Sequence, residues 1–191
     1  MVKKRKGHKT VKDIIETINE NRIIFLHGEI NAASANEVIL KLLYLDGISD
    51  EDISLYINSP GGSVQDGLAI IDTMNFINSD VATIGIGLCA SMAAIILASG
   101  AKDNRSALPH TDIMLHQVMG GFQGQASDIQ IAAEKTKKVK NTLNKILTEV
   151  TGQSYKKIEK DTDRDFWLSS KEAIEYGIID KVLEKKELVA S

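Results

Sequence analysis

The sequence of 191 residues contains little cysteine and little proline. Its single cysteine, Cys89, excludes an internal disulfide and a cysteine-rich metal cluster, and this usage is typical of a reducing compartment. We therefore expect a cytoplasmic protein. Two prolines leave no proline-rich linker to mark a domain boundary, and a chain of this length forms one domain by default.

The sequence also has few aromatic residues and no large excess of either charge. The 23 basic and 26 acidic residues leave a net charge of −3, and aromatic residues make up 5% of the chain. This composition favours neither a field that attracts phosphates nor a surface on which bases stack. Nucleic acid is therefore not an expected partner. Hydrophobic residues at 43% and charged residues at 26% are typical of a globular protein.

Charges are missing altogether from Val81 to Ala101, a run that is long enough to span a bilayer. Glycines interrupt this run, and its β-branched residues gather in the first third. The pattern favours a buried strand, a turn near Gly87 and a buried helix over a membrane span. The basic start, residues 3–9, is not followed by an apolar segment, so we expect a solvated tail and no secretion signal.

Helical and strand patterns alternate along the rest of the chain. The apolar spacing predicts helices over 11–19, 33–45, 64–77, 91–98 and 127–150 and after Ser169, and strands over 23–26, 53–57, 81–86 and 113–116 and near Val182. Ser127 with Gln130, and Ser169 with Glu172, are spaced as capping boxes. This alternation predicts an α/β domain with a largely parallel sheet.

Two predicted strand ends carry glycines, and in open α/β sheets the functional crevice lies at such ends. Residues 59–63, Ser-Pro-Gly-Gly-Ser, can leave amides free for an oxyanion, although a plain turn is the commoner role. Ser91 follows the second glycine turn and begins a helix, where a strand-to-helix elbow can expose a nucleophile. The segment does not match G-x-S-x-G, and capping of the helix is the alternative role of Ser91.

A nucleophilic serine needs a base, and the chain has four histidines. His116 is favoured because it ends a predicted strand just before Gly120 and Gly121, whereas a surface role is about as common for such a residue. Nothing in the pattern singles out an acid among the 26 carboxylates.

Two other chemistries are weaker. His110, Asp112 and His116 do not have the spacing of a zinc site, so we expect no metal. Cys89 lies in an apolar run, which is typical of a core cysteine and not of a reactive thiol.

Five segments together closely resemble the ClpP peptidases: residues 56–62, 90–92, 114–117, 120–129 and 161–165. The resemblance runs from about Arg22 to Val182 in the order of that family. It implies a serine endopeptidase that cleaves unfolded proteins to short peptides. The roles it implies are Ser91 as nucleophile, His116 as general base, Asp165 as the carboxylate that orients His116, and the amides of Gly62 and Met92 as the oxyanion hole.

The resemblance also implies a crotonase-like α/β fold with a protruding helix-strand handle, built from residues 120–129 and the helix over 127–150. Residues 1–21 would be a basic axial segment and residues 22–191 the peptidase domain. Two rings of seven subunits would enclose the active sites, with Asp163 and Arg164 pairing between rings. Substrate backbone would pair with an extended strand near Gly120, Gly121 and Phe122.

The implied partner is a hexameric AAA+ unfoldase, which uses the ATP, so this chain would need no cofactor. Its docking pocket would include the positions of Ser54, Tyr56, Phe76 and Ser106. The family usually has aromatic residues at all four, and here two are serines. Val118 replaces a usual proline and Ala93 a usual glycine, and residues 1–21 do not match the usual axial segment.

These departures leave two functions open besides an active, unfoldase-dependent endopeptidase. One is a structural subunit of low activity that assembles with a better ClpP paralogue. The other is an acyl-CoA enzyme on the crotonase fold, against which the segments around His116 and Asp165 argue.

Overall fold

The computed structural model describes residues 10–184. Within them a seven-stranded sheet has the order β1-β2-β3-β4-β7, while β5 pairs with β3 and with β6. Only the β5–β6 pair is antiparallel. The strands are β1 (Ile23–His27), β2 (Ile53–Ser59), β3 (Val81–Ala90), β4 (Arg105–Ala107), β5 (Asp112–Leu115), β6 (Phe166–Ser169) and β7 (Lys181–Val182).

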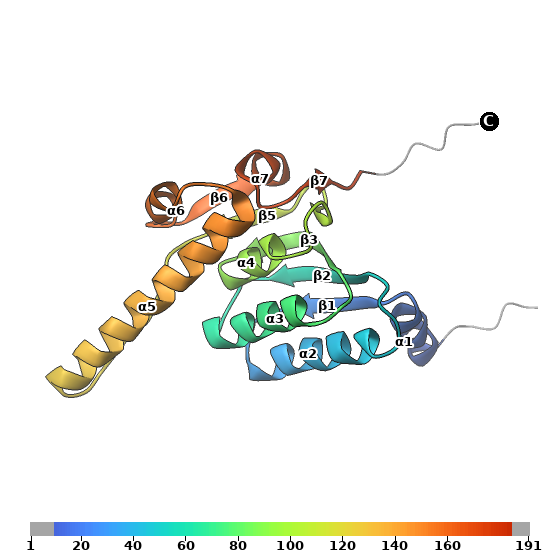
Figure 1. Ribbon diagram of the computed structural model, residues 1–191, viewed down its shortest axis with the longest axis horizontal. Helices are drawn as coiled ribbons and strands as arrows, with labels where there is room; N and C mark the ends of the chain where they lie inside the picture. The colour runs from blue at the N-terminus through green and yellow to red at the C-terminus, as the bar shows by residue number, and fades with distance from the viewer. Residues whose placement is uncertain (1–9, 185–191) are drawn as a thin grey trace, which may run out of the picture.

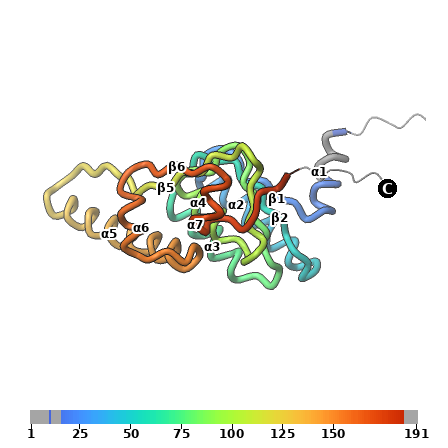
Figure 2. Tube along the Cα trace, turned by 90° about the horizontal axis from the view of Figure 1, so that it is seen from above, coloured from blue at the N-terminus to red at the C-terminus, as the bar shows by residue number. Residues whose placement is uncertain are grey.

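The helices lie beside the sheet and beyond it. They are α1 (Val11–Glu20), α2 (Ala32–Asp46), α3 (Val64–Phe76), α4 (Met92–Ala98), α5 (Ala126–Thr151), α6 (Tyr155–Asp161) and α7 (Ser170–Tyr176). Helices α2 and α3 run side by side, and the long α5 projects from the body (Figure 1). The tip of α5 and the helix α1 lie at opposite ends of the molecule in both views (Figures 1 and 2).

This arrangement confirms the α/β fold and the protruding helix of the predicted handle. The segment before α5 differs from the prediction, because residues 116–125 form no strand in the single chain. An extended segment without a paired neighbour has no ladder of hydrogen bonds. The basic start over residues 3–9 lies outside the described residues.

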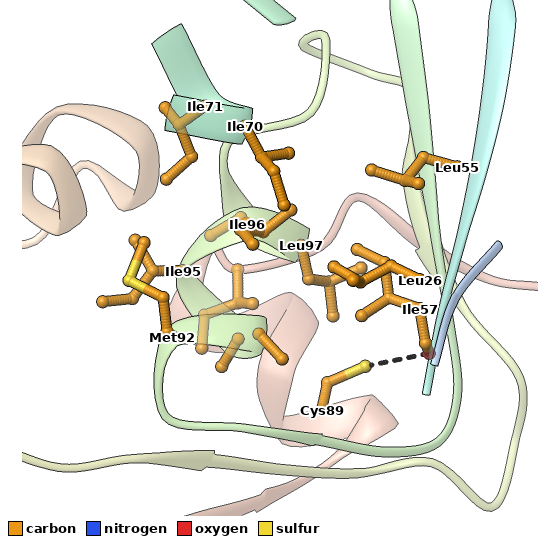
Figure 3. Close-up of a cluster of buried hydrophobic side chains, with 14 of the residues drawn as sticks. Leu26, Leu55, Ile57, Ile70, Ile71, Cys89, Met92, Ile95, Ile96 and Leu97 are labelled. Atoms are coloured by element: carbon orange, nitrogen blue, oxygen red, sulfur yellow. Dashed lines mark hydrogen bonds between the residues drawn. The ribbon is translucent and has the colours of Figure 1, made fainter. Parts of the chain in front are cut away.

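The core fills the space between the sheet and the helices on one of its faces. Along β2 buried residues alternate with more exposed ones, as expected for a strand with one covered face. Every residue of α4 is buried, and Figure 3 shows Leu97 of this helix facing Leu26 and Ile57 of the sheet, with Ile96 beside Ile70 of α3. Burial of α4 therefore explains the uncharged run from Val81 to Ala101. Among the described residues no helix is both long enough and apolar enough to cross a membrane.

Two local predictions were wrong. Strand β3 does not end before Gly87 but continues to Ala90, with Gly87 in the left-handed region at φ 68°. Helix α5 starts at Ala126, after Gln125, and its N-cap residue makes no side-chain capping bond, so the Ser127 box is absent. The box of Ser169 with Glu172 is present and begins α7. Three elements were missed, namely β4, α6 and β6, which are seven residues long or shorter.

A buried arginine attaches the C-terminal elements to the sheet. Arg105 of β4 forms a bidentate pair with Asp180, at 2.6 Å and 3.0 Å, and also donates to the carbonyls of Ala98, Val150 and Gly177. Burial raises the pKa of Asp180, but the hydrogen bonds and charge of Arg105 outweigh it and lower that pKa overall. The ion pair is therefore kept at neutral pH.

We expect Arg105→Ala to lower the free energy of unfolding by about 3–5 kcal/mol, because it leaves a mostly buried carboxylate without its partner. Urea denaturation followed by circular dichroism measures this loss. The matched control is Lys41→Ala, which removes an exposed i,i+4 pair with Glu37 and is expected to cost less than about 1 kcal/mol. Equal losses in the two variants would contradict the structural role of Arg105.

Candidate active site

Ser91 lies between β3 and α4 in a strained backbone conformation. Its φ of 56° and ψ of −124° are rare for a residue with a side chain. The Ser91 amide donates to the Met114 carbonyl at 2.8 Å, which ties this turn to β5. The hydroxyl makes no capping bond to α4. Capping therefore does not explain this serine, whose side chain is directed elsewhere.

His116 connects the hydroxyl to a carboxylate. Its Nε2 lies 2.8 Å from the Ser91 Oγ, and its Nδ1 lies 3.3 Å from Oδ1 of Asp165. The imidazole is largely buried, at 14% exposure, whereas the Asp165 side chain is 61% exposed. A base between a hydroxyl and an orienting carboxylate is the arrangement that activates a serine for attack.

The strand register brings these three residues together. Leu115 of β5 pairs with Phe166 of β6 in antiparallel register, so one step further places His116 opposite Asp165. In the parallel β3–β5 pair, Ala90 lies beside Met114, which places Ser91 next to the end of β5. Ser91 and His116 are predicted from their positions at a helix start and a strand end, whereas the sequence pattern does not reveal β6 and so does not single out the acid. An antiparallel partner for the strand of His116 was the missing signal.

The two residues predicted for the oxyanion hole lie beside Ser91. Gly62 and Met92 line a cavity of about 220 Å³ together with Ser91 and His116. Met92 is the first residue of α4, where a helix leaves the amide without an intrahelical acceptor. Gly62 has φ 147°, and a Cβ there would lie 2.2 Å from the Ile30 carbonyl oxygen, so only glycine fits. Both positions suit amides that stabilise an oxyanion.

A larger cavity of about 710 Å³ continues from this site along α5. Gly120 and Phe122 line it, whereas the neighbouring Gly121 is exposed and does not. Val118, at the usual proline position, lines both cavities. Gly120 and Phe122, two of the three predicted substrate-binding residues, therefore line the same groove as Val118, which replaces the usual proline.

Cys89 is a core residue and is not placed to act as a nucleophile. It is fully buried, and its Sγ donates to the Ile57 carbonyl at 3.3 Å (Figure 3). Burial raises the pKa of this thiol to about 12, so the thiolate is absent at neutral pH. Within residues 10–184 no group of three or more His, Cys, Asp and Glu side chains is placed to hold a metal ion.

The residues predicted for partner contacts lie on two surfaces, one directly beside Asp165 of the triad and the other on the sheet. Asp163 and Arg164 are exposed, and Gln117 donates to the Asp163 carbonyl at 3.0 Å. The register aligns Ser54 and Tyr56 of β2 with Ser106 of β4 through β3 on one sheet face.

The pocket residues differ in exposure. Phe76 is 82% exposed, and the Tyr56 ring lies 5.5 Å from the ring of Phe25 on the neighbouring strand. Ser106, in contrast, is buried at 3% exposure and donates to the Thr83 carbonyl. The pocket stays a prediction, and in the single chain Ser106 contributes little surface to it.

These contacts define a serine hydrolase with a Ser-His-Asp triad. The chain belongs to the Clp protease family, whose model matches residues 5–186, and it is a serine peptidase of that family. It is 51% identical over 187 residues to the ATP-dependent Clp protease proteolytic subunit of Bacteroides fragilis, with 97% of this chain and 90% of that protein covered. The family match extends beyond residues 22–182 at both ends, and it does not support an acyl-CoA enzyme.

We expect Ser91→Ala to reduce peptide hydrolysis to background, a loss of roughly 10⁶-fold as in other triads, although Cys89 is intact. A fluorophosphonate probe is expected to label the original protein and not this variant, as read by intact mass. Ser99→Ala, at the opposite end of α4, is the control and is expected to keep its activity because its hydroxyl donates to the Ile95 carbonyl within that helix. Retained hydrolysis in Ser91→Ala would show that another group is the nucleophile.

Proposed function

We propose that this chain is the proteolytic subunit of a barrel-shaped, unfoldase-dependent protease that degrades unfolded proteins to short peptides. The observation that carries the chemistry is the position of the His116 ring. Its Nε2 lies 2.8 Å from the Ser91 Oγ, and its Nδ1 lies 3.3 Å from Oδ1 of Asp165. The name of the Bacteroides fragilis relative supports the dependence on ATP. The ATP is used by the partner, and this chain needs no cofactor.

The cleavage follows from the triad. Ser91 Oγ attacks the peptide carbonyl as His116 Nε2 takes its proton, and the amides of Gly62 and Met92 stabilise the oxyanion. His116 then gives the proton to the leaving amine, and the acyl group stays on Ser91. Water attacks this ester, again with His116 as base, and releases the second peptide. Asp165 keeps the imidazole in the orientation and tautomer that both steps need.

The substrate is an unfolded chain in an extended conformation. The segment from Gly120 to Phe122 follows the groove beside Ser91 and has no strand partner of its own. Backbone pairing with this segment gives affinity without a requirement for particular side chains. This mode suits a protease that cuts unrelated sequences.

Assembly into two stacked rings of seven is supported by apolar residues that the single chain leaves uncovered. Met119 is 77% exposed, Ile131 is 67% exposed and Phe122 is 51% exposed, all on or beside the projecting α5. Apolar residues gathered on a projecting element are typical of an interface. Enclosure of the sites in such a barrel keeps folded proteins away from Ser91. The single buried Cys89 supports a cytoplasmic location.

We expect Arg164→Ala to shift the protein toward single rings and to lose peptidase activity in parallel. The reason is that Asp163 and Arg164 directly precede Asp165, so loss of a ring contact there also displaces the catalytic carboxylate. Native mass measurement and hydrolysis of a fluorogenic peptide test this together. Lys171→Ala, which removes an exposed cation of α7, is the control. Active single rings, or inactive double rings, would contradict the coupling.

The alternative of a low-activity subunit in a mixed complex depends on the docking pocket. A few aromatic anchors carry most of the energy of such interfaces, about 2 kcal/mol or more each. Ser54 and Ser106 replace two of them, and seven sites multiply a modest loss through avidity. We therefore expect the homo-oligomer to bind an unfoldase weakly and to need a ClpP paralogue for efficient protein degradation.

The measurement is ATP-dependent degradation of a tagged, unfoldable substrate as purified unfoldase is titrated. Hydrolysis of a short peptide, which needs no unfoldase, is the internal control. Ser54→Tyr, at the partly exposed serine position of the pocket, is expected to restore part of the degradation without changing peptide hydrolysis. Robust degradation by the unmodified homo-oligomer would refute the requirement for a second subunit.

A further inference from the structure

Few contacts hold the side chain of Asp165. It is 61% exposed, and its described contact is the 3.3 Å approach to His116 Nδ1. This distance is longer than the 2.7–2.9 Å usual for a charge-assisted bond, which leaves the carboxylate loosely held. The position of Asp165 therefore depends on the backbone to which it is attached, and above all on the next residue, Phe166.

Phe166 is the first residue of β6 and is anchored by an aromatic contact. Its ring centroid lies 5.3 Å from that of Tyr176 in α7, with the ring planes tilted by 50°. Tyr176 is only 5% exposed. Aromatic pairs at this separation and tilt are favourable beyond the burial of their surface. Tyr176 thus holds Phe166 in place, and Phe166 is the residue that joins Asp165 to β6.

Tyr176 is itself held by a charged pair from α6. Its hydroxyl donates to Asp161 Oδ2 at 2.8 Å, and the Lys157 ammonium donates to the same oxygen at 2.5 Å. The ammonium also lies 4.4 Å from the centre of the Tyr176 ring and 6.0 Å from that of Phe166. Lys157 therefore contacts all the other members of this cluster.

The protonation states of the cluster keep these bonds in place. Burial raises the pKa of Asp161, but hydrogen bonds from Lys157 and Tyr176 outweigh it and lower that pKa overall. Burial, and next the bond to Asp161, raise the pKa of Tyr176. At neutral pH the carboxylate is therefore ionised and the hydroxyl keeps the proton that it donates.

We propose that Tyr176, with Asp161 and Lys157, is a positioning residue for the catalytic carboxylate and acts on Asp165 through Phe166. This inference rests on the proposed role of Asp165 as the residue that orients His116. A purely structural role of the cluster, the attachment of α6 to α7, would affect stability or assembly but not the turnover of the assembled enzyme.

The first test is Tyr176→Phe, which keeps the ring contact and removes the bond to Asp161. We expect kcat for a fluorogenic peptide to fall about threefold to tenfold with KM unchanged, because small displacements of a catalytic group cost rate and not substrate binding. Tyr155→Phe is the matched control. Tyr155 lies at the other end of α6, and this change removes the bond that its hydroxyl donates to Asn141 of α5. The variant is expected to keep the original kcat. Native mass and circular dichroism are compared in all variants.

If Tyr176→Phe does not assemble, Lys157→Gln replaces it, because the Lys157 side chain is 45% exposed and tolerates substitution. The same fall in kcat with unchanged KM supports the proposal. Unchanged kcat in an assembled variant overturns it. A fall in kcat that is matched by Tyr155→Phe also overturns it, since that result reports a general effect on α6.

The second test is a double-mutant cycle with Asp165→Asn, followed with an activated ester that reports slow turnover. Asp165→Asn alone is expected to lower kcat by roughly 10⁴-fold, the loss seen when a triad aspartate is replaced in a serine protease. In that background Tyr176→Phe is expected to have no further effect. Additive losses overturn the inference alone. Full activity of Asp165→Asn overturns the role of Asp165 and the inference with it.

Discussion

The site depends on one strand that pairs with different neighbours along its length. The first half of β3 pairs with β4, and its second half pairs with β5. The division falls at Gly87, whose φ of 68° turns the backbone and whose missing Cβ would lie 3.2 Å from Asn58 Oδ1. The same Asn58 oxygen accepts from the Leu88 amide. We call this division of β3 the fork at Gly87. The branch through β4 leads to the ion pair of Arg105 with Asp180, and the branch through β5 leads to Ser91 and His116.

The branch through β5 places each residue of the proposed triad at a strand end. Ser91 follows β3, His116 follows β5 and Asp165 precedes β6. Because β5 and β6 are antiparallel and β3 and β5 are parallel, all three ends lie at the same edge of the sheet. The pairing of the strands thus sets the approximate positions of Ser91, His116 and Asp165, and side-chain contacts make only the final adjustment of these positions. The ion pair of Arg105 with Asp180 belongs to the other branch, where β4 pairs with β7 at the end of the sheet.

Local patterns predicted most elements but not the fork. Glycine signals a turn more often than a bend within a strand, so the pattern predicts the end of this strand before Gly87. Strand β6 has four residues and lies between short helices, which is too little pattern to detect. Without β6 the register opposite His116 was unknown, so Asp165 could be assigned only through resemblance to a family. Ser91 and His116 were found because strand ends and helix starts are visible in a single sequence.

A glycine inside α3 shows how the packing supports this chemistry. Glycine in a helix interior costs about 1 kcal/mol relative to alanine. At Gly67 a Cβ would lie 2.3 Å from Cγ of Met92, so the helix gives up that stability to make room for the Met92 side chain. Met92 is 1% exposed and directly follows Ser91. Its buried side chain therefore fixes the start of α4, and with it the direction of the Met92 amide that we propose as part of the oxyanion hole.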